Sequence, residues 1–295
     1  MSIPDIRIPG MDSDTAWGIA VRSVMNFMRH DMVTYASSLA YTILFALFPF
    51  LIFLVALVSF LEIPDFFDWI LEQAEKTFPD LAYEWLEAMI GQIQEPAGGL
   101  LSIGAVLAIW TASSGFRAVM KGLNAAYEVK ETRPVWALFP LSIAYTIGLA
   151  VLLVLGAALA LLSPERFEWL ARHTDLSDAV VTVWSWLRFP VLVIVLMLVA
   201  AILYYVAPNA EQHFTVISPG AIFAVIVWLV GSQVLSFFID NFGNYNATYG
   251  SIAGVIVLLF FLFLSSAVLL LGGEINAEVL RSRAAKNEPP DDTPA

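Results

Sequence analysis

The feature that most constrains this chain is a run from Met32 to Leu61 without one charged residue. A helix needs about 20 consecutive apolar residues to cross a bilayer. Several further runs of this kind follow, and only 14% of all residues are charged, against about 25% in an ordinary soluble domain. Backbone polar groups in lipid must be satisfied within their own segment, so runs of this length predict helices and not barrel strands. The sequence therefore predicts an all-α, polytopic integral membrane protein.

We expect six transmembrane helices in a single membrane domain that covers residues 1–283. They lie at about residues 36–61, 98–120, 136–162, 189–207, 214–239 and 248–273. Before them, residues 14–29 predict an amphipathic helix at the membrane interface, with its N-cap among residues 12–14. The acidic, Pro-rich tail, residues 284–295, is poor in apolar side chains and is expected to be disordered.

The placement of basic residues predicts the orientation, because Lys and Arg favour the cytoplasmic ends of transmembrane helices. An even number of spans puts both termini on one side, and that side carries ten of the 14 Lys and Arg residues. Both termini are therefore expected in the cytoplasm. The longest loop, residues 62–97, would face the periplasm. Its apolar residues recur at helical spacing on either side of Pro79, which predicts two short amphipathic helices.

Composition argues against several kinds of function. The absence of cysteine excludes disulfides and thiolate sites. The three histidines, His30, His173 and His213, lie in separate segments without the spacing of metal ligands, so neither a metal site nor a cofactor is expected. The net charge of −12 and the lack of a basic patch argue against nucleic acid as a partner. No G-x-S-x-G motif or other catalytic constellation is visible, so we do not expect an enzyme.

Polar residues from five of the expected spans meet in the cytoplasmic half of the membrane. They are Ser38, Tyr41, Ser113, Ser114, Arg117, Lys121, Asn124, Tyr127, Tyr205, Asn209, Glu274 and Asn276. Such residues are costly in lipid and usually face the interior of the bundle. In one interpretation they line a cytoplasm-facing cavity, in which Arg117 and Lys121 hold an anionic lipid or a small anion and Glu274 is a counter-charge or proton carrier. In the other, they only pack and anchor helices.

The stretch "NFGNYNATYGSIAG", residues 241–254, predicts a short outer connection between the fifth and sixth spans. Its polar residues, with Asp240, either form an outer gate or only pack: Asp240, Asn241, Asn244, Tyr245, Asn246 and Tyr249. Glycines and prolines in and near the spans predict close helix packing or hinges. These residues are Pro49, Gly115, Pro208, Pro219, Gly220, Gly250 and Gly254.

Six segments carry a resemblance to a known family. They are "ASSLAYTILFALFPFLIFLVAL" (36–57), "ASSGFRAVMKGLNAAYEV" (112–129), "YYVAPNA" (204–210), "PGAIFAVIVWLVGSQVLSFFI" (219–239), "NYNATYGSIAGVIVLL" (244–259) and "LLLGGEINAEV" (269–279). In these the chain resembles the YihY/virulence factor BrkB family of bacterial inner-membrane proteins. The resemblance implies a six-helix membrane protein without an established activity, and it brings an older ribonuclease label. RNA hydrolysis needs clustered metal ligands or an acid/base pair, and neither is visible, so we reject that label.

Two functions remain open from the sequence. The first is a transporter or lipid-handling protein that binds or moves an anionic lipid or small anion, motivated by the convergent polar residues. The second is a non-transporting envelope scaffold that binds partner proteins and is linked to virulence or envelope integrity, motivated by the acidic outer loop and the small-residue faces. A membrane enzyme acting on lipids comes third. Membrane lipids are the expected partners in each case, and the oligomeric state stays open.

Overall fold

The computed structural model describes residues 15–60, 98–161, 178–242 and 246–287, with a few positions between 71 and 88. Towards the ends of several helices only the backbone is described. These residues form helices α1 (Ala16–Arg29), α2 (Met32–Phe60), α5 (Gly98–Ala126), α6 (Val135–Leu161), α8 (Asp178–Val206), α9 (Pro219–Phe242) and α10 (Asn246–Asn287). No strand occurs within the described ranges, which confirms the all-α prediction for them.

Five of these helices are long and apolar enough to cross a membrane. The qualifying windows are Met32–Pro49, Val135–Gly156, Trp186–Val206, Pro219–Phe237 and Gly254–Ala284. Large apolar side chains along them are exposed, for example Trp186 at 80% and Phe237 at 66%. Helical surfaces of this kind are stable against lipid, because every backbone group is already bonded within the helix. The chain is therefore a multi-pass integral membrane protein.

The helix bounds differ from the expected span bounds at several points. Helix α2 begins at Met32 and not near residue 36, α5 runs on to Ala126, and α9 begins at Pro219 and not near residue 214. Helix α8 begins at Asp178 and runs through Pro190, whereas the span was expected to begin near residue 189. Helix α10 continues to Asn287, well past the expected end at residue 273. In both cases the helix extends beyond the run of apolar residues, because hydropathy marks the lipid-facing part of a helix and not its end. The predicted helices of 62–97 and the tail after Asn287 lie almost entirely outside the described residues.

Thr15 caps the N-terminus of helix α1, and its Oγ1 accepts a hydrogen bond from the Gly18 N–H at 3.1 Å. The predicted cap among residues 12–14 is therefore wrong, since the helix starts just after them. Helix α1 buries Gly18, Ser23 and Phe27. Trp17 and Met28, which share another face, are exposed at 71% and 66%, as on a helix at the membrane interface. The interfacial location itself stays a prediction.

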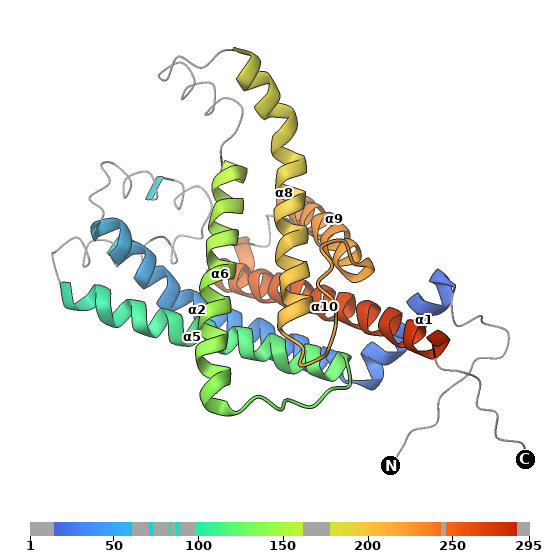
Figure 1. Ribbon diagram of the computed structural model, residues 1–295. Coiled ribbons are helices and arrows are strands. Elements are labelled where there is room, and N and C mark those ends of the chain that lie inside the picture. The colour runs from blue at the N-terminus through green and yellow to red at the C-terminus, as the bar shows by residue number, and fades with distance from the viewer. Residues whose placement is uncertain are drawn as a thin grey trace, which may run out of the picture.

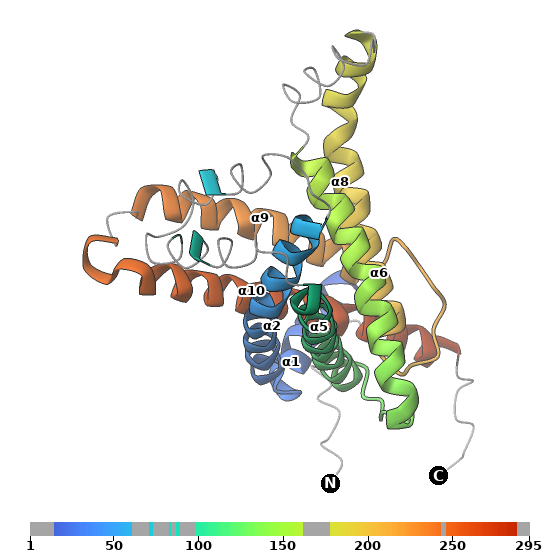
Figure 2. The same ribbon diagram turned by 90° about the vertical axis from the view of Figure 1, so that its left-hand side faces the viewer.

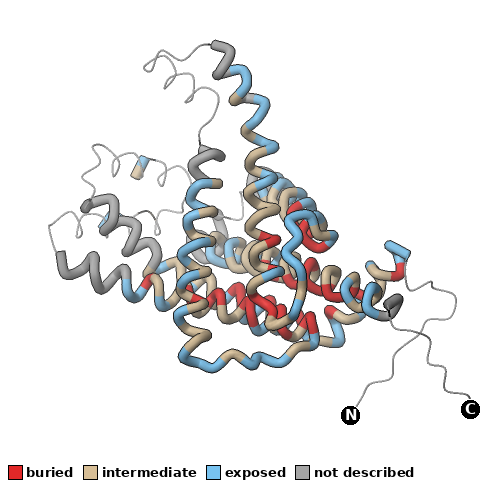
Figure 3. The backbone as a smooth tube through the Cα atoms, in the orientation of Figure 1, coloured by how far each residue is buried: buried red, intermediate tan, exposed pale blue. Residues whose placement is uncertain are grey.

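The longer helices form three neighbouring pairs, α2 with α5, α6 with α8, and α9 with α10, which diverge from a common region (Figures 1 and 2). We call this region the hub. It contains α1, the first turns of α2, α6 and α9, the last turns of α5 and α8, and the C-terminal half of α10. Most of the described buried residues lie there (Figure 3). The hub is therefore where the three pairs are held together.

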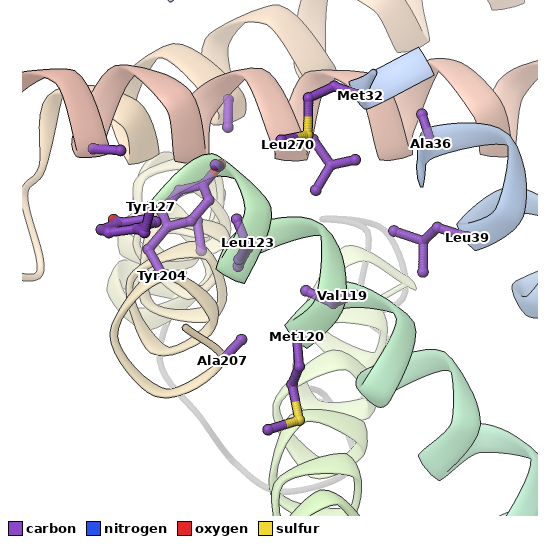
Figure 4. Packing of buried hydrophobic residues seen from close by; sticks show 14 of the residues in the cluster. Met32, Ala36, Leu39, Val119, Met120, Leu123, Tyr127, Tyr204, Ala207 and Leu270 are labelled. Atoms are coloured by element: carbon purple, nitrogen blue, oxygen red, sulfur yellow. The ribbon is translucent and has the colours of Figure 1, made fainter. Parts of the chain in front are cut away.

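Glycines let the helices of the hub interlock. A Cβ atom added to Gly122 on α5 would lie 2.7 Å from Leu270 on α10, and one added to Gly273 would overlap Leu123. Each leucine thus fills the space above a glycine of the other helix, and both lie in the core shown in Figure 4. Tyr204 on α8 completes the contact, because its hydroxyl donates to the Leu269 carbonyl at 2.8 Å.

Candidate functional site

Arg117 lies between α5 and α6. Its Nη1 donates to Ser113 Oγ at 2.9 Å and to Ser142 Oγ at 3.0 Å, and its guanidinium lies 4.3 Å from the centroid of the Phe139 ring. Both serines are fully buried. A guanidinium has five N–H donors, and within the described ranges no carboxylate pairs with this one. Four other described arginines, Arg22, Arg29, Arg133 and Arg281, all pair with glutamates.

The neighbours of Arg117 on α5 do not all join it. Lys121, one turn along the helix, is exposed and has no ion-pair partner among the described residues. Ser114 is half-buried, and its hydroxyl donates to the Thr111 carbonyl at 2.6 Å. A Cβ added to Gly115 would meet nothing within 4 Å, so this glycine does not mark the close helix approach expected of it. Arg117 with Ser113 and Ser142 is the polar group formed here.

Two predicted site residues lie on the exposed face of α2. Ser38 is exposed, and Tyr41 is 58% exposed with its ring centroid 4.6 Å from that of Phe45. Neither has a hydrogen bond to the Arg117 group among the described contacts. The polar residues expected to line one cavity therefore divide into separate groups.

Asn124 and Asn209 belong to a network that joins the segment after α5 to the segment after α8. Asn124 Nδ2 donates to Glu131 Oε2 at 2.9 Å, and the Asn209 N–H donates to Asn124 Oδ1 at 2.7 Å. Arg133 donates to both oxygens of Glu131, at 2.6 and 2.7 Å, and to the Ala207 carbonyl at 3.0 Å. The two asparagines thus satisfy backbone groups and position two loops. Pro208, directly before Asn209, is buried.

This network predicts a pH dependence of stability. Hydrogen bonds from Arg133 hold the pKa of the Glu131 carboxyl below its ordinary value, with burial opposing them. A lower pKa in the folded state stabilises the fold above the ordinary glutamate pKa of about 4.3, and the stabilisation is lost as the pH falls below it. We expect Glu131→Gln to lower the melting temperature at neutral pH, and the difference from wild type to shrink below about pH 4. A difference that stays constant down to about pH 3 would contradict this origin; exposed Glu211→Gln is the control.

Asn276 on α10 helps to cap α9. Ser218 Oγ accepts from the Ala221 N–H at 3.2 Å, and Pro219 occupies the first helical position, where its missing N–H costs nothing. Asn276 Oδ1 accepts from the Gly220 N–H at 2.8 Å, and its Nδ2 donates to Ser218 Oγ at 3.0 Å. Tyr127, just after α5, is buried in the core, and burial raises its pKa well above its ordinary value. The capping contacts of Asn276 and the burial of Tyr127 are structural roles.

Glu274 lies in a cluster that the sequence did not predict. Its Oε1 is 2.7 Å from His30 Nδ1, and His30 Nε2 is 3.1 Å from Glu128 Oε1. Arg29 Nη2 lies 2.7 Å from Glu128 Oε1, and Arg281 Nη2 lies 3.5 Å from the same oxygen. We call these five residues the His30 cluster. It joins the turn between α1 and α2 to the end of α5 and to α10.

Glu128 occupies the left-handed position that ends helix α5. The Glu128 and Val129 N–H groups bond to the carbonyls of Ala125 and Asn124, which is a Schellman motif at the end of α5. Its left-handed position, where glycine is usual, holds Glu128 at φ 56°. A non-glycine residue there costs about 1 kcal/mol, which the contacts of the carboxylate offset. Asp31, with φ 54°, adopts the same conformation directly after His30.

A sequence signal for the His30 cluster did exist. Glu274, Glu278 and Arg281 recur at i, i+4 and i+7, which places them on one face of a helix that continues beyond residue 273. Glu278 accepts from Asn26 at 3.2 Å and from Arg281 at 3.1 Å, and it pairs with Arg22. The sixth span was expected to end at residue 273, so residues after it were not considered as part of a helix.

Tyr205 lines an apolar cavity of about 330 Å³ between α6, α8 and the segment after α8. The lining consists of Tyr145, Gly148, Leu149, Leu152, Ile202, Tyr205, Val206 and Phe214. The ring of Tyr145 also stacks on Phe116 of α5, with centroids 5.6 Å apart. The cavity beside Tyr205 is therefore apolar, unlike the polar cavity expected from the sequence.

The outer residues are described only in part. Helix α9 contains Asp240 and Asn241, and α10 begins at Asn246 and contains Tyr249 and Gly250, but only the backbone of these positions is described. Asn244 and Tyr245 lie outside the described residues, so the outer gate stays a prediction. Gly254 lies half-buried in α10, and Pro49 lies within α2. Within the described residues no three His, Asp or Glu side chains are placed to hold a metal ion.

Comparisons with known proteins place the chain in a family. A family model described as Virulence factor BrkB matches residues 23–295. The ribonuclease-like protein YfkH of Bacillus subtilis (strain 168) is 36% identical over 262 residues, which cover 88% of this chain and 94% of that protein. UPF0761 membrane proteins of Nitrosospira multiformis and Rhodospirillum centenum are both 27% identical, over 87% and 95% of this chain.

This chain spans only 59% and 61% of the length of the Nitrosospira and Rhodospirillum relatives. No solved structure matches it. The family match begins within α1 and covers the three helix pairs, with Arg117 and all five residues of the His30 cluster. The chain therefore belongs to the virulence factor BrkB family of membrane proteins.

Proposed function

We propose that this protein is a transporter or lipid-handling protein of the bacterial inner membrane that binds an anionic lipid at Arg117. The observation that carries the proposal is the state of this guanidinium. Two buried hydroxyls hold Nη1, and no described carboxylate neutralises the charge. A positive charge kept at such a position without a counter-charge suits an anionic ligand.

The surroundings favour a lipid over a free anion. Phe116, next to Arg117, stacks on Tyr145, which also lines the apolar cavity beside α8. A cation near an apolar cavity suits a molecule with an anionic headgroup and an acyl chain. In this arrangement the headgroup meets Arg117, with Lys121 as a second cation one turn away, and the chain lies along α6 and α8.

We further propose six spans with both termini in the cytoplasm. Helix α5, the second span expected from the sequence, adds one span to the five apolar helices. It returns to the hub beside α2 (Figure 2). The hub then lies on the cytoplasmic side, since it carries many of the basic residues, among them Arg22, Arg29, Arg133 and Arg281. This orientation puts Arg117 at the cytoplasmic end of its helix, where a headgroup can reach it.

Binding of anionic lipid to the purified full chain tests the proposal directly. Native mass spectrometry would compare phosphatidylglycerol with phosphatidylcholine for wild type, Arg117→Ala and Lys130→Ala. Lys130 is an exposed cation near the same end of α5, so its variant is a matched control for charge. We expect Arg117→Ala to bind phosphatidylglycerol about tenfold more weakly, because a charge-assisted hydrogen bond contributes about 1.5–3 kcal/mol.

Movement of lipid is tested separately in proteoliposomes. We expect wild type to transfer fluorescent phosphatidylglycerol between leaflets faster than empty vesicles do, and Arg117→Ala to lose most of the excess rate. Displacement of the lipid by millimolar inorganic phosphate would identify a small anion as the ligand instead. Equal binding by wild type and Arg117→Ala would rule out this site. Rates equal to empty vesicles would rule out transfer and leave the scaffold function, for which crosslinking should find a stoichiometric protein partner.

A further inference from the structure

Three side chains of the His30 cluster form a chain from the surface to a buried carboxyl. Glu128 Oε1 lies 3.1 Å from His30 Nε2, and His30 Nδ1 lies 2.7 Å from Glu274 Oε1. The exposed fraction of the side chain falls from 49% at Glu128 to 13% at His30 and to 0% at Glu274. An imidazole between two carboxyl groups can take a proton on one nitrogen and give one up from the other.

The contacts of His30 fit two protonation states. A neutral imidazole has one N–H, so both ring nitrogens can donate to carboxylates only when the cluster holds one additional proton. Without that proton, Nδ1–H donates to Glu274, and Nε2 accepts from Arg29 Nη2, which lies 3.2 Å away. Each state has a partner for both nitrogens, so a proton can enter and leave without a loss of hydrogen bonds at the ring.

Glu274 gives a second, independent indication. Its side chain has no exposure, and its Oε2 has no hydrogen-bond partner among the described residues. A buried carboxylate oxygen without a partner is costly. A proton on this carboxyl removes the charge, and the group then remains as a neutral acid at no such cost.

The charges that face the cluster come from every element packed against it. They are Arg22 and Arg29 of α1, exposed Asp31 of the following turn, Glu128 after α5, and Glu274, Glu278 and Arg281 of α10. Tyr127, also after α5, stays neutral because burial raises its pKa. Setting aside exposed Asp31, three arginines balance three glutamates, so an additional proton is the one uncompensated charge in the interior.

We propose that Glu128, His30 and Glu274 form a proton relay that carries a proton from solvent to the buried carboxyl of Glu274. The proton binds to Nε2, and the proton on Nδ1 passes to the Glu274 carboxylate. The imidazole thereby exchanges one neutral tautomer for the other, and Glu274 becomes a carboxylic acid. Because these residues belong to the α1–α2 turn, the end of α5 and α10, loading the proton changes contacts between helix pairs. The relay does not depend on an anion site at Arg117.

Nitrogen NMR of the full chain in nanodiscs, with ¹⁵N-labelled histidine, tests the relay. The signals of His30 are those missing from His30→Gln. At about pH 8 we expect a neutral imidazole with its proton on Nδ1, and on acidification a neutral imidazole with its proton on Nε2, because the Nδ1 proton has passed to Glu274. Glu274→Gln keeps the shape of the side chain but cannot take up this proton, so the change of tautomer should be absent. Glu211→Gln, which removes an exposed carboxylate away from the cluster, should show the same change of tautomer as wild type.

Infrared difference spectra on acidification locate the proton itself. We expect a carbonyl band of a protonated carboxylic acid in wild type and in Glu211→Gln that is absent from Glu274→Gln. An unchanged band in Glu274→Gln would overturn the assignment to Glu274. A change of tautomer that persists in Glu274→Gln would overturn the relay, and so would a His30 that keeps its single proton on Nδ1 down to about pH 5.

Discussion

A Gly220→Ala variant is expected to be strongly destabilised, although it gains only one methyl group. Gly220 is the second residue of α9, and an added Cβ would overlap the Gly272 carbonyl oxygen on α10 and lie 2.7 Å from Asn276 Cγ. One obstacle is backbone and the other caps the helix, so no simple side-chain rotation makes room. Helix α9 must therefore move away from α10 and loosen the hydrogen bond from the Gly220 N–H to Asn276.

We expect this change to cost about 3 kcal/mol or more, since overpacking alone costs about 1–3 kcal/mol and the loosened hydrogen bond adds to it. The measurement is the melting temperature of the purified protein in detergent, followed by tryptophan fluorescence. Gly231→Ala is the matched control, because Gly231 lies in the same helix and an added Cβ meets nothing within 4 Å. Alanine favours a helix over glycine by about 1 kcal/mol, so this control should be neutral or more stable. Equal melting temperatures would contradict the close contact of α9 with α10.

The sequence predicted the helices well wherever lipid decides the structure. Charge-free runs gave α2, α6 and the apolar part of α10, because a backbone in lipid has few alternatives to a helix. The sequence did not predict that α8 begins at Asp178 or that α10 continues to Asn287. The added turns of α10 are held by contacts in the folded protein. Glu274 and Glu278 are polar and yet buried, since His30 and Arg22 lie against them.

The candidate site was predicted unevenly for a similar reason. Arg117 and Ser113 are four residues apart on one helix, and this spacing predicts their contact. One shared polar cavity was expected because all these residues lie in the cytoplasmic half of the membrane. That location does not determine which polar groups bond to each other. Asn124 donates to the loop residue Glu131, and Asn276 accepts from the start of α9, so neither side chain belongs to the expected cavity. His30 lies 244 positions from its partner Glu274, and no local pattern connects the two.

A Glu278→Ala variant is expected to release α1 from α10. Glu278 is 8% exposed and accepts hydrogen bonds from Arg22, Asn26 and Arg281. Breaking a buried ion pair costs about 3–5 kcal/mol; here we expect about 2–3 kcal/mol, because the partly exposed side chains of Arg22 and Arg281 keep part of their hydration. Limited trypsin digestion measures the release, since cleavage after Arg22 and Arg29 should become faster than in wild type.

Two comparisons separate this effect from a general loss of stability. Glu211→Ala removes an exposed carboxylate from the segment after α8 and should leave tryptic cleavage of α1 unchanged. Glu278→Gln keeps an acceptor for Arg22 or Asn26 and should lie between wild type and Glu278→Ala. Cleavage of α1 at the same rate in all variants would show that Glu278 does not hold the helix. Because His30 directly follows α1, its release should also draw His30 away from Glu274, so the change of His30 tautomer on acidification should be lost in Glu278→Ala as the cleavage rate rises.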